Sequence, residues 1–211
     1  MGSRPPEEVR TARLWLRCWR AEDAPLFLRA VEQSLRHLRA WLPWADSEPS
    51  DPVEVAQRLA GFAAAFRAGE NWHYGIFDPG GRQVLGGSGL HPRRGTGVLE
   101  IGYWIHAHHV RQGYATEAAQ ALARAAFDVH GIERVEIRCD ARNAPSAGVP
   151  RRLGFPLVET IRADPEAPST RPRDTLVFRL ERGERERLSA PSARQSAHEG
   201  AKGAPRGADP R

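Results

Sequence analysis

The sequence predicts an α/β domain built on a mixed, mostly antiparallel sheet of about seven strands with four helices. Two observations support this fold class. Apolar residues alternate with polar residues in several short segments, as they do in strands, whereas longer segments repeat their apolar residues at the spacing of helices. After residue 98 a strand, a helix and another strand follow one another, and this order is typical of a crossover between parallel strands.

The first half of the chain contains two expected helices and four expected strands. The helices span residues 21–31 and 53–67, and the second has Asp51 as its N-cap and Pro52 in its first turn. A turn is expected at residues 78–81, where Asp-Pro-Gly-Gly stands between two apolar runs. The expected strands are 12–19, 73–77, 83–90 and 98–106.

The second half begins with a strongly amphipathic helix over residues 115–129. Its apolar stripe consists of Ala115, Ala118, Ala119, Leu122, Ala126 and Val129. A strand around residues 135–139 and a short helix follow, and strands near 155–162 and 174–180 close the domain.

Composition sets the limits of the folded unit, which we expect to span residues 11–181. Residues 1–10 form an expected flexible leader. Residues 182–211 contain one leucine and no other large apolar side chain, so they are expected to form a disordered tail. Two widely spaced cysteines, Cys18 and Cys139, indicate a reducing compartment rather than a disulfide framework or a zinc site.

The composition also argues against several classes of protein. No run of 18 apolar residues predicts a membrane span, and the N-terminus lacks the apolar centre of a secretory signal, so we expect a cytoplasmic protein. The net charge is +5 and the pI about 10. The arginines that cause it are spread along the chain and are not interleaved with aromatic residues, so nucleic-acid binding is not expected.

One motif runs from an apolar strand, LEIGYWI at residues 99–105, into the glycine-containing segment VRQGYATE at residues 110–117. That segment opens the alanine-rich helix, whose N-terminus exposes unpaired N–H groups and the positive end of the helix dipole. Such a turn can bind a pyrophosphate with backbone donors alone. Gly113 permits the close approach of a ligand to the backbone, and the small side chain of Ala115 leaves room for the ligand beside the helix. A plain strand-to-helix turn is the alternative interpretation.

A second motif, RCDARNAPS followed by RRLGF, covers residues 138–155. Asn143 is expected to cap the short helix, with Pro145 in its first turn and Gly154 at its end. Asn143 and Ser146 then face the previous crossover. Pro150 removes a helical N–H, so the helix is expected to be short or kinked.

Together these motifs resemble the GNAT N-acetyltransferases, and within them the Rim-type enzymes that acetylate ribosomal-protein N-termini. The resemblance covers about residues 11–181 and also includes the opening segment 11–27 and residues 37–44. It implies the GNAT fold and an acyl-CoA cosubstrate. This chain departs from the family at Val110 and Arg111, because the family usually begins its phosphate loop with Gln or Arg and then a small residue.

The resemblance also implies where CoA binds. Pantetheine is expected along the strand, and the pyrophosphate on the loop and helix start. Asn143 is expected near the thioester and Ser146 near the sulfur. The cofactor-binding residues predicted in this way are Trp104, Ile105, His106, Val110, Arg111, Gln112, Gly113, Tyr114, Ala115, Thr116, Asn143 and Ser146.

The predicted reaction is direct attack of an amine on acetyl-CoA in a ternary complex. The acceptor is a protein N-terminus or a small-molecule amine, and the protein is a monomer or homodimer. A larger acyl group such as succinyl remains an alternative, as does a non-catalytic acyl-CoA-binding or ribosome-associated module, which the departure at Val110 and Arg111 favours.

Two residues are the predicted catalytic groups. Glu100 shares a strand face with Val98, Gly102 and Trp104, and a carboxylate among such neighbours is a candidate general base, with a glutamate on an open strand face as the alternative. Ser146 is the candidate acid toward the CoA sulfur, with a capping role as its alternative.

Further side chains have weaker predicted roles. Trp41 and Trp44 are expected to form an apolar wall of the acceptor pocket, or else to pack in the core. No metal is expected, because His106, His108 and His109 lack a cysteine or carboxylate partner at ligand spacing and are interpreted as solvated loop residues. Tyr103 and Tyr114 are not at the motif position at which a tyrosine serves as the acid in many GNAT enzymes.

Overall fold

The computed structural model describes residues 4–93, 95–165 and 173–189 of the 211-residue chain. Its eight strands form one sheet in the order β1-β2-β3-β4-β5-β6-β8-β7. The strands are β1 Glu8–Arg10, β2 Trp15–Cys18, β3 Trp72–Phe77, β4 Val84–Pro92, β5 Val98–Ile105, β6 Arg134–Asp140, β7 Leu157–Ile161 and β8 Thr175–Glu181. The α-helices are α1 Ala24–Glu32, α2 Leu35–Arg39, α3 Pro52–Ala68, α4 Tyr114–Phe127 and α5 Ala144–Arg152. The short 3₁₀ helices are η1 Ala21–Asp23, η2 Pro43–Ser47, η3 Ala107–His109 and η4 Arg182–Ser189.

The α/β class and the mixed, mostly antiparallel sheet are confirmed, but the described part of the chain has one more strand and one more α-helix than expected. The additional elements are β1, with three residues, and α2, with five. Segments this short complete too few repeats to show a period, so alternation and helical spacing could not reveal them.

The ordered structure also extends beyond the expected unit at both ends. In the expected leader, β1 pairs antiparallel with β2, and the Tyr74 hydroxyl donates to the Pro6 carbonyl oxygen at 2.7 Å. In the expected tail, η4 buries Leu188 completely. The bounds 11–181 were therefore too narrow for these two segments. Residues 1–3 and 190–211, the rest of the expected leader and tail, lie outside the described residues.

The helix predicted from capping signals, α3, begins and ends as its sequence indicates. The Asp51 carboxylate accepts a hydrogen bond from the Val53 N–H at 2.8 Å and so satisfies one free donor of the first turn. Gly69 adopts φ +75° at the other end, a left-handed conformation that glycine reaches without steric cost.

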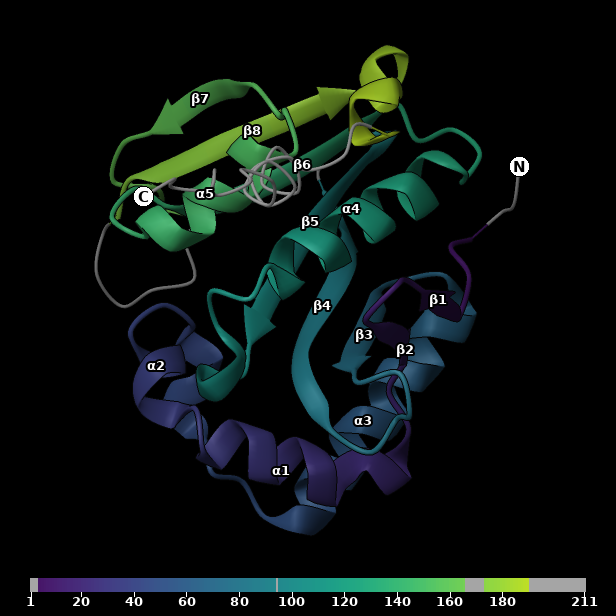
Figure 1. Ribbon diagram of the computed structural model, residues 1–211, viewed down its shortest axis with the longest axis vertical. Coiled ribbons are helices and arrows are strands. Elements are labelled where there is room, and N and C mark those ends of the chain that lie inside the picture. The colour runs from purple at the N-terminus through teal and green to yellow at the C-terminus, as the bar shows by residue number, and fades with distance from the viewer. Residues whose placement is uncertain (1–3, 94, 166–172, 190–211) are drawn as a thin grey trace, which may run out of the picture.

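Helices cover both faces of the sheet (Figure 1). Phe27 of α1 and Leu59 of α3 pack with Phe77 on one face. Leu122 of α4 and Val149 of α5 belong to the core on the other face. Successive residues of β5 therefore point alternately toward α4 and toward α1, as period-two alternation requires.

The sheet divides between β5 and β6, its one parallel pair of strands. These strands pair only over Val98–Glu100 and Arg134–Glu136, although β5 continues to Ile105 and β6 to Asp140. In Figure 1 the part formed by β6, β8 and β7 lies at the top, and the part with β1 to β5 lies below, with α4 crossing between them. The separation exposes one edge of each strand to the space between them.

A candidate active-site cleft

A cleft occupies the space where β5 and β6 separate. Its volume is about 1880 Å³, and its walls include β5, β6, the start of α4 and the start of α5. Because β6 stops pairing with β5 after Glu100, the peptide groups of residues 101–105 face the cleft on that edge and can bind an extended ligand. The cleft continues to α2, where His37 and Leu38 line it.

The glycine loop, residues 110–113, forms one end of the cleft. Gly113 is the N-cap of α4 with φ +84°, and no side chain caps the helix by hydrogen bonding. The N–H groups of the first turn therefore point out of the helix toward any ligand placed there. Arg111 has φ +63°, a conformation that costs a residue other than glycine about 1–3 kcal/mol and that is often found at binding sites.

Most of the residues predicted to bind CoA lie together along this cleft. Those that line it are Trp104, Ile105, Val110, Arg111, Gln112, Gly113, Tyr114, Ala115, Thr116, Asn143 and Ser146. They come from two segments that the crossover helix α4 brings to the same side of the sheet. The one predicted residue that does not line the cleft is His106.

His106 is a structural residue that connects two elements. Its side chain is buried, Nε2 is 2.9 Å from Gln33 Oε1 beyond the end of α1, and Nδ1 accepts the His108 N–H at 3.1 Å. The expectation of solvated loop histidines was therefore wrong for His106, although His108 is exposed. Within the residues that the structure describes, no group of three or more His, Cys, Asp or Glu side chains has a metal-binding arrangement.

Asn143 caps α5 as expected. Its side-chain oxygen accepts the Ser146 N–H at 3.1 Å, and its own N–H donates to the Asp140 carbonyl oxygen at 2.9 Å. With nine residues, α5 is short, and Pro150 lies inside it. This cap fixes the position of Ser146 at the wall of the cleft.

Tyr103, which the sequence interpretation set aside, lies directly against Ser146. The Tyr103 hydroxyl donates to the Ser146 carbonyl oxygen at 3.0 Å and is 3.3 Å from Ser146 Oγ. Burial raises the pKa of Tyr103, so its hydroxyl keeps its proton at neutral pH. The signal in the sequence was the strand period, because Tyr103 shares with Ile101 and Ile105 the face that α5 also covers.

Cys139 belongs to the same cluster and also lines the cleft. Burial raises the pKa of its thiol to about 11, although a hydrogen bond with Ser146 acts in the opposite direction. The thiol is therefore protonated near neutral pH and is a weak nucleophile. This agrees with the interpretation of Cys139 as a packed residue rather than a covalent catalyst.

Glu100 lines the cleft, but its surroundings differ from those expected. Its carboxylate is 2.5 Å from Arg93 Nε and 3.5 Å from Arg138 Nε, and the side chain is 12% exposed. The expectation of mainly apolar neighbours was wrong, because it considered only residues of the same strand. Arg93 directly follows the last residue of β4. Arg138 belongs to β6, which pairs with β5 in parallel.

More charged residues continue along the wall that contains Glu100. We call Arg93, Glu100, Arg138, Asp140 and Arg173 the polar wall, since all five line the cleft. Arg173 lies 3.3 Å from Asp140 and also donates to the Ala40 carbonyl oxygen at 3.4 Å, which connects β8 with the end of α2. Hydrogen bonds from Arg142 and the charge of Arg173 hold the pKa of Asp140 below its usual value.

The two predicted acceptor tryptophans have different positions. Trp41 lines the cleft, but Trp44 does not. Trp44 is 36% exposed and packs against Trp104 and Phe27, with ring centroids 6.1 and 6.5 Å apart. Trp44 therefore supports Trp104, which is itself in the wall, from outside the cleft.

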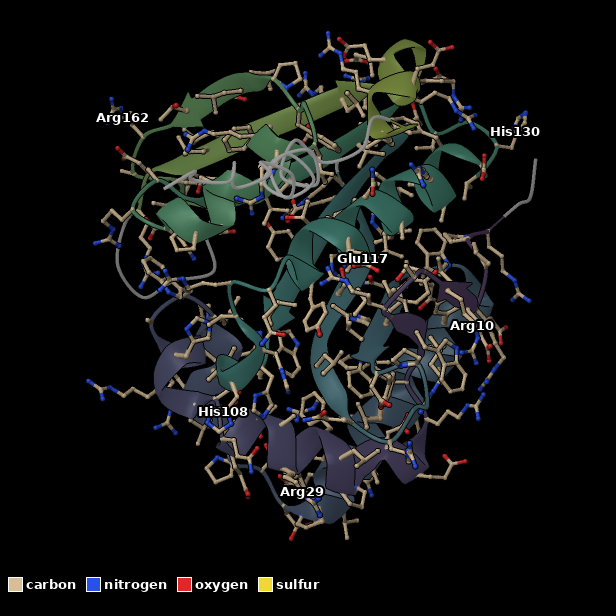
Figure 2. All side chains as sticks on the ribbon, in the orientation of Figure 1. Arg10, Arg29, His108, Glu117, His130 and Arg162 are labelled. Atoms are coloured by element: carbon tan, nitrogen blue, oxygen red, sulfur yellow. The ribbon has the colours of Figure 1, made fainter. Side chains whose placement is uncertain are left out.

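A clamp between distant segments was missed by the sequence interpretation. Thr11 and Arg13, in the turn between β1 and β2, both bind Glu117 in the first turn of α4. More than 100 residues separate the partners, so no local spacing could indicate the contact. Glu117 is labelled on α4 in Figure 2.

The described helices include none that is long and apolar enough to cross a membrane.

Comparison with known proteins gives results that agree with this geometry. A family model described as an acetyltransferase (GNAT) domain matches residues 13–156. The chain is 36% identical to the uncharacterized N-acetyltransferase YjdG of Bacillus subtilis (strain 168) over 76 residues, which span 36% of this chain but only 45% of YjdG. It is 26% identical to the uncharacterized N-acetyltransferase p20 of Bacillus licheniformis over 177 residues, or 82% of this chain and 96% of p20.

Among solved structures, the fold is shared with RimL, a ribosomal L7/L12 α-N-protein acetyltransferase, in complex with coenzyme A. The TM-score is 0.73 at 21% identity, and the superposition covers 83% of this chain and 98% of RimL.

Proposed function

The chain belongs to the GNAT acetyltransferase family, and we propose that it transfers the acetyl group of acetyl-CoA to the free α-amine of a protein N-terminus in the cytoplasm. One observation carries this proposal. The cleft between the separated strands β5 and β6 ends at the uncapped N-terminus of α4, where the glycine loop turns its backbone donors outward. A thioester with an extended arm and a pyrophosphate has the shape and charge for such a cleft.

The residues of the cleft fit an acyl-CoA. The open edge of β5 offers peptide groups to the pantetheine arm, and Gly113 and Ala115 leave room for the pyrophosphate at α4. The departure at Val110 and Arg111 leaves these backbone donors in place. Asn143 and Ser146 are placed by the cap of α5 at the wall where the two strands separate.

Glu100 is the proposed base of the reaction. The amine must lose a proton as its nitrogen forms the new bond to the carbonyl carbon, and a carboxylate can accept this proton directly or through a water molecule. Arg93 and Arg138 fix the orientation of the Glu100 side chain at the wall of the cleft.

Tyr103 and Ser146 are the proposed acid. When the carbon–sulfur bond breaks, the leaving thiolate needs a proton, and two adjacent hydroxyl groups can supply it. Tyr103 is protonated at neutral pH because burial raises its pKa, and both Tyr103 and Ser146 line the cleft. The protonated Cys139 favours direct attack over an acyl-enzyme.

The acceptor is proposed from the shape of the site and from the comparison with RimL, which acts on a ribosomal protein and shares the fold. The cleft continues from the separated strands to α2, so an extended peptide end has room in it. The test is a thiol-release assay with acetyl-CoA or succinyl-CoA, using peptides with free or blocked N-termini and a panel of small amines. We expect release with acetyl-CoA and free N-termini, and none with blocked ones.

Two other outcomes would contradict the proposal. Faster turnover of small amines than of any peptide would move the acceptor to small molecules, and a preference for succinyl-CoA would change the acyl group. If the protein binds CoA but releases no thiol with any amine, it is a non-catalytic acyl-CoA-binding module.

The proposed base is tested with Glu100→Gln, which we expect to lower kcat about 100-fold while the Kd for CoA changes less than about twofold. The control is Glu159→Gln on the exposed strand β7, which removes the same charge at a residue that does not line the cleft. Equal kcat values for the two variants would exclude Glu100 as the base.

A further inference from the structure

Glu117 places a negative charge where a pyrophosphate is expected to bind. It lies in the first turn of α4 and lines the cleft, and its side chain is 17% exposed. A carboxylate at a helix N-terminus interacts favourably with the helix dipole, but it repels any other anion that binds there. An unpaired Glu117 would therefore oppose CoA binding.

The carboxylate is bound by the turn between β1 and β2. Glu117 Oε2 accepts hydrogen bonds from Arg13 Nε at 2.7 Å and lies 2.7 Å from Arg13 Nη2. Its Oε1 accepts the Thr11 hydroxyl at 2.6 Å and the Arg13 N–H at 3.1 Å. Both carboxylate oxygens are thus engaged, and Oε2 is contacted by two guanidinium nitrogens of Arg13 in a charge-assisted interaction.

Arg13 also reaches the glycine loop. Its Nη1 donates to the Gln112 carbonyl oxygen at 3.0 Å, and its guanidinium lies 4.8 Å from the centre of the Tyr114 ring. A Cβ atom at Gly113 would be 3.4 Å from Arg13 Nη2. The guanidinium therefore lies directly beside the open end of α4, with its side chain 49% exposed.

We propose that Arg13 cancels the charge of Glu117 so that the first turn of α4 accepts the phosphates of a CoA thioester. This inference rests on the proposed use of a CoA thioester, but not on the acceptor or on turnover. The compensating positive charge thus comes from a residue about 100 positions away from Glu117 in the sequence.

The test measures binding by titration calorimetry of the full chain, with two probes. CoA carries the phosphates, and acetyl-pantetheine lacks them. We expect Arg13→Gln to weaken CoA binding about tenfold because it leaves Glu117 uncompensated, and to change acetyl-pantetheine binding less than about twofold. Glu117→Gln should tighten CoA binding about threefold, and the double variant should recover most of the wild-type affinity.

Arg29→Gln is the control for net charge, because Arg29 is exposed on α1, does not line the cleft and is well separated from Glu117 in Figure 2. The proposal is wrong if Arg13→Gln weakens both probes alike, which is the result of a purely structural clamp. It is equally wrong if the double variant binds CoA no better than Arg13→Gln.

If Arg13→Gln does not fold, Arg13→Lys and Glu117→Gln decide the question. Lysine keeps the charge, so CoA affinity should fall less than about threefold, and Glu117→Gln should still tighten binding. Weaker CoA binding by Glu117→Gln would overturn the proposal. Failure of the proposed function gives a different result, namely a wild-type protein that binds CoA in this pattern but acetylates no amine.

Discussion

The glycine loop and the polar wall face the same cleft but are built in different ways. The loop is one continuous segment, and what it offers a ligand is mainly backbone N–H groups fixed by Gly113 and the start of α4. The polar wall combines side chains from β5, β6, the residue after β4 and the residues before β8, and each carboxylate in it is paired with an arginine. The backbone donors of the loop do not depend on which side chains the loop carries. The geometry of the polar wall depends on each of its charged side chains, because each one is held by an oppositely charged partner.

This difference separates two kinds of specificity. A backbone site at a helix N-terminus recognises the phosphate group that all CoA thioesters share. A wall of paired side chains can distinguish acceptors, because each paired charge must find a new partner when a ligand displaces the old one. Three sets of variants test the local differences within the molecule.

The largest effect is expected from Gly113→Val. A β-branched residue is strongly disfavoured at φ +84°, so the start of α4 should reorganise and CoA affinity should fall about 100-fold, measured by calorimetry. The matched control is Gly69→Val, at φ +75° at the end of α3. It should lower the thermal stability but leave CoA affinity within about twofold. Equal losses of affinity in both variants would mean that backbone geometry at the loop is not decisive.

An intermediate effect is expected from Trp41→Ala. Trp41 lines the cleft toward α2, so its removal should raise the KM for the acceptor about tenfold while the Kd for CoA stays unchanged. Trp44→Ala is the control, because Trp44 packs on Trp104 outside the cleft, and it should change the KM less than about threefold. A change of CoA affinity in Trp41→Ala would contradict the proposed separation between the part of the cleft that binds CoA and the part that binds the acceptor.

The smallest effect is expected in the pH dependence of stability. His73 and His91 lie on the sheet face that also carries Glu100, and burial lowers the pKa of each to about 4, with the charges of His73 and Arg93 contributing at His91. Between pH 6.5 and 4 the unfolded chain binds protons that the folded chain does not, so stability is complete above pH 6.5 and falls as the pH decreases through this range.

His91→Gln removes one of these groups and should reduce the fall in Tm between pH 7 and pH 5 by about 3 °C. His130→Gln, at an exposed position labelled in Figure 2, should leave this fall unchanged. Parallel Tm curves for His91→Gln and the wild type would contradict the assignment.

Features carried by one continuous segment were predictable from the sequence. The cap of α3 at Asp51, the cap of α5 at Asn143 and the glycine loop all depend on residues within a few positions of each other. Their hydrogen bonds form wherever the segment is placed, because the donor and acceptor are held together by the local backbone. The α/β order and the residues of the glycine loop follow from such segments.

Which side chains meet across strands and crossovers depends on the tertiary structure. Glu100 is beside Arg138 because β5 and β6 are neighbouring parallel strands, and Tyr103 meets Ser146 because α5 belongs to the core on the same face as Tyr103. Arg13 reaches Glu117 because the turn between β1 and β2 lies beside the start of α4. Each of these pairs is distant in sequence, so its formation depends on the whole packing of the core rather than on local spacing. Local segments of the sequence therefore predict the fold class and the glycine loop, whereas the packing of the strands sets which charged and hydroxyl side chains surround the cleft.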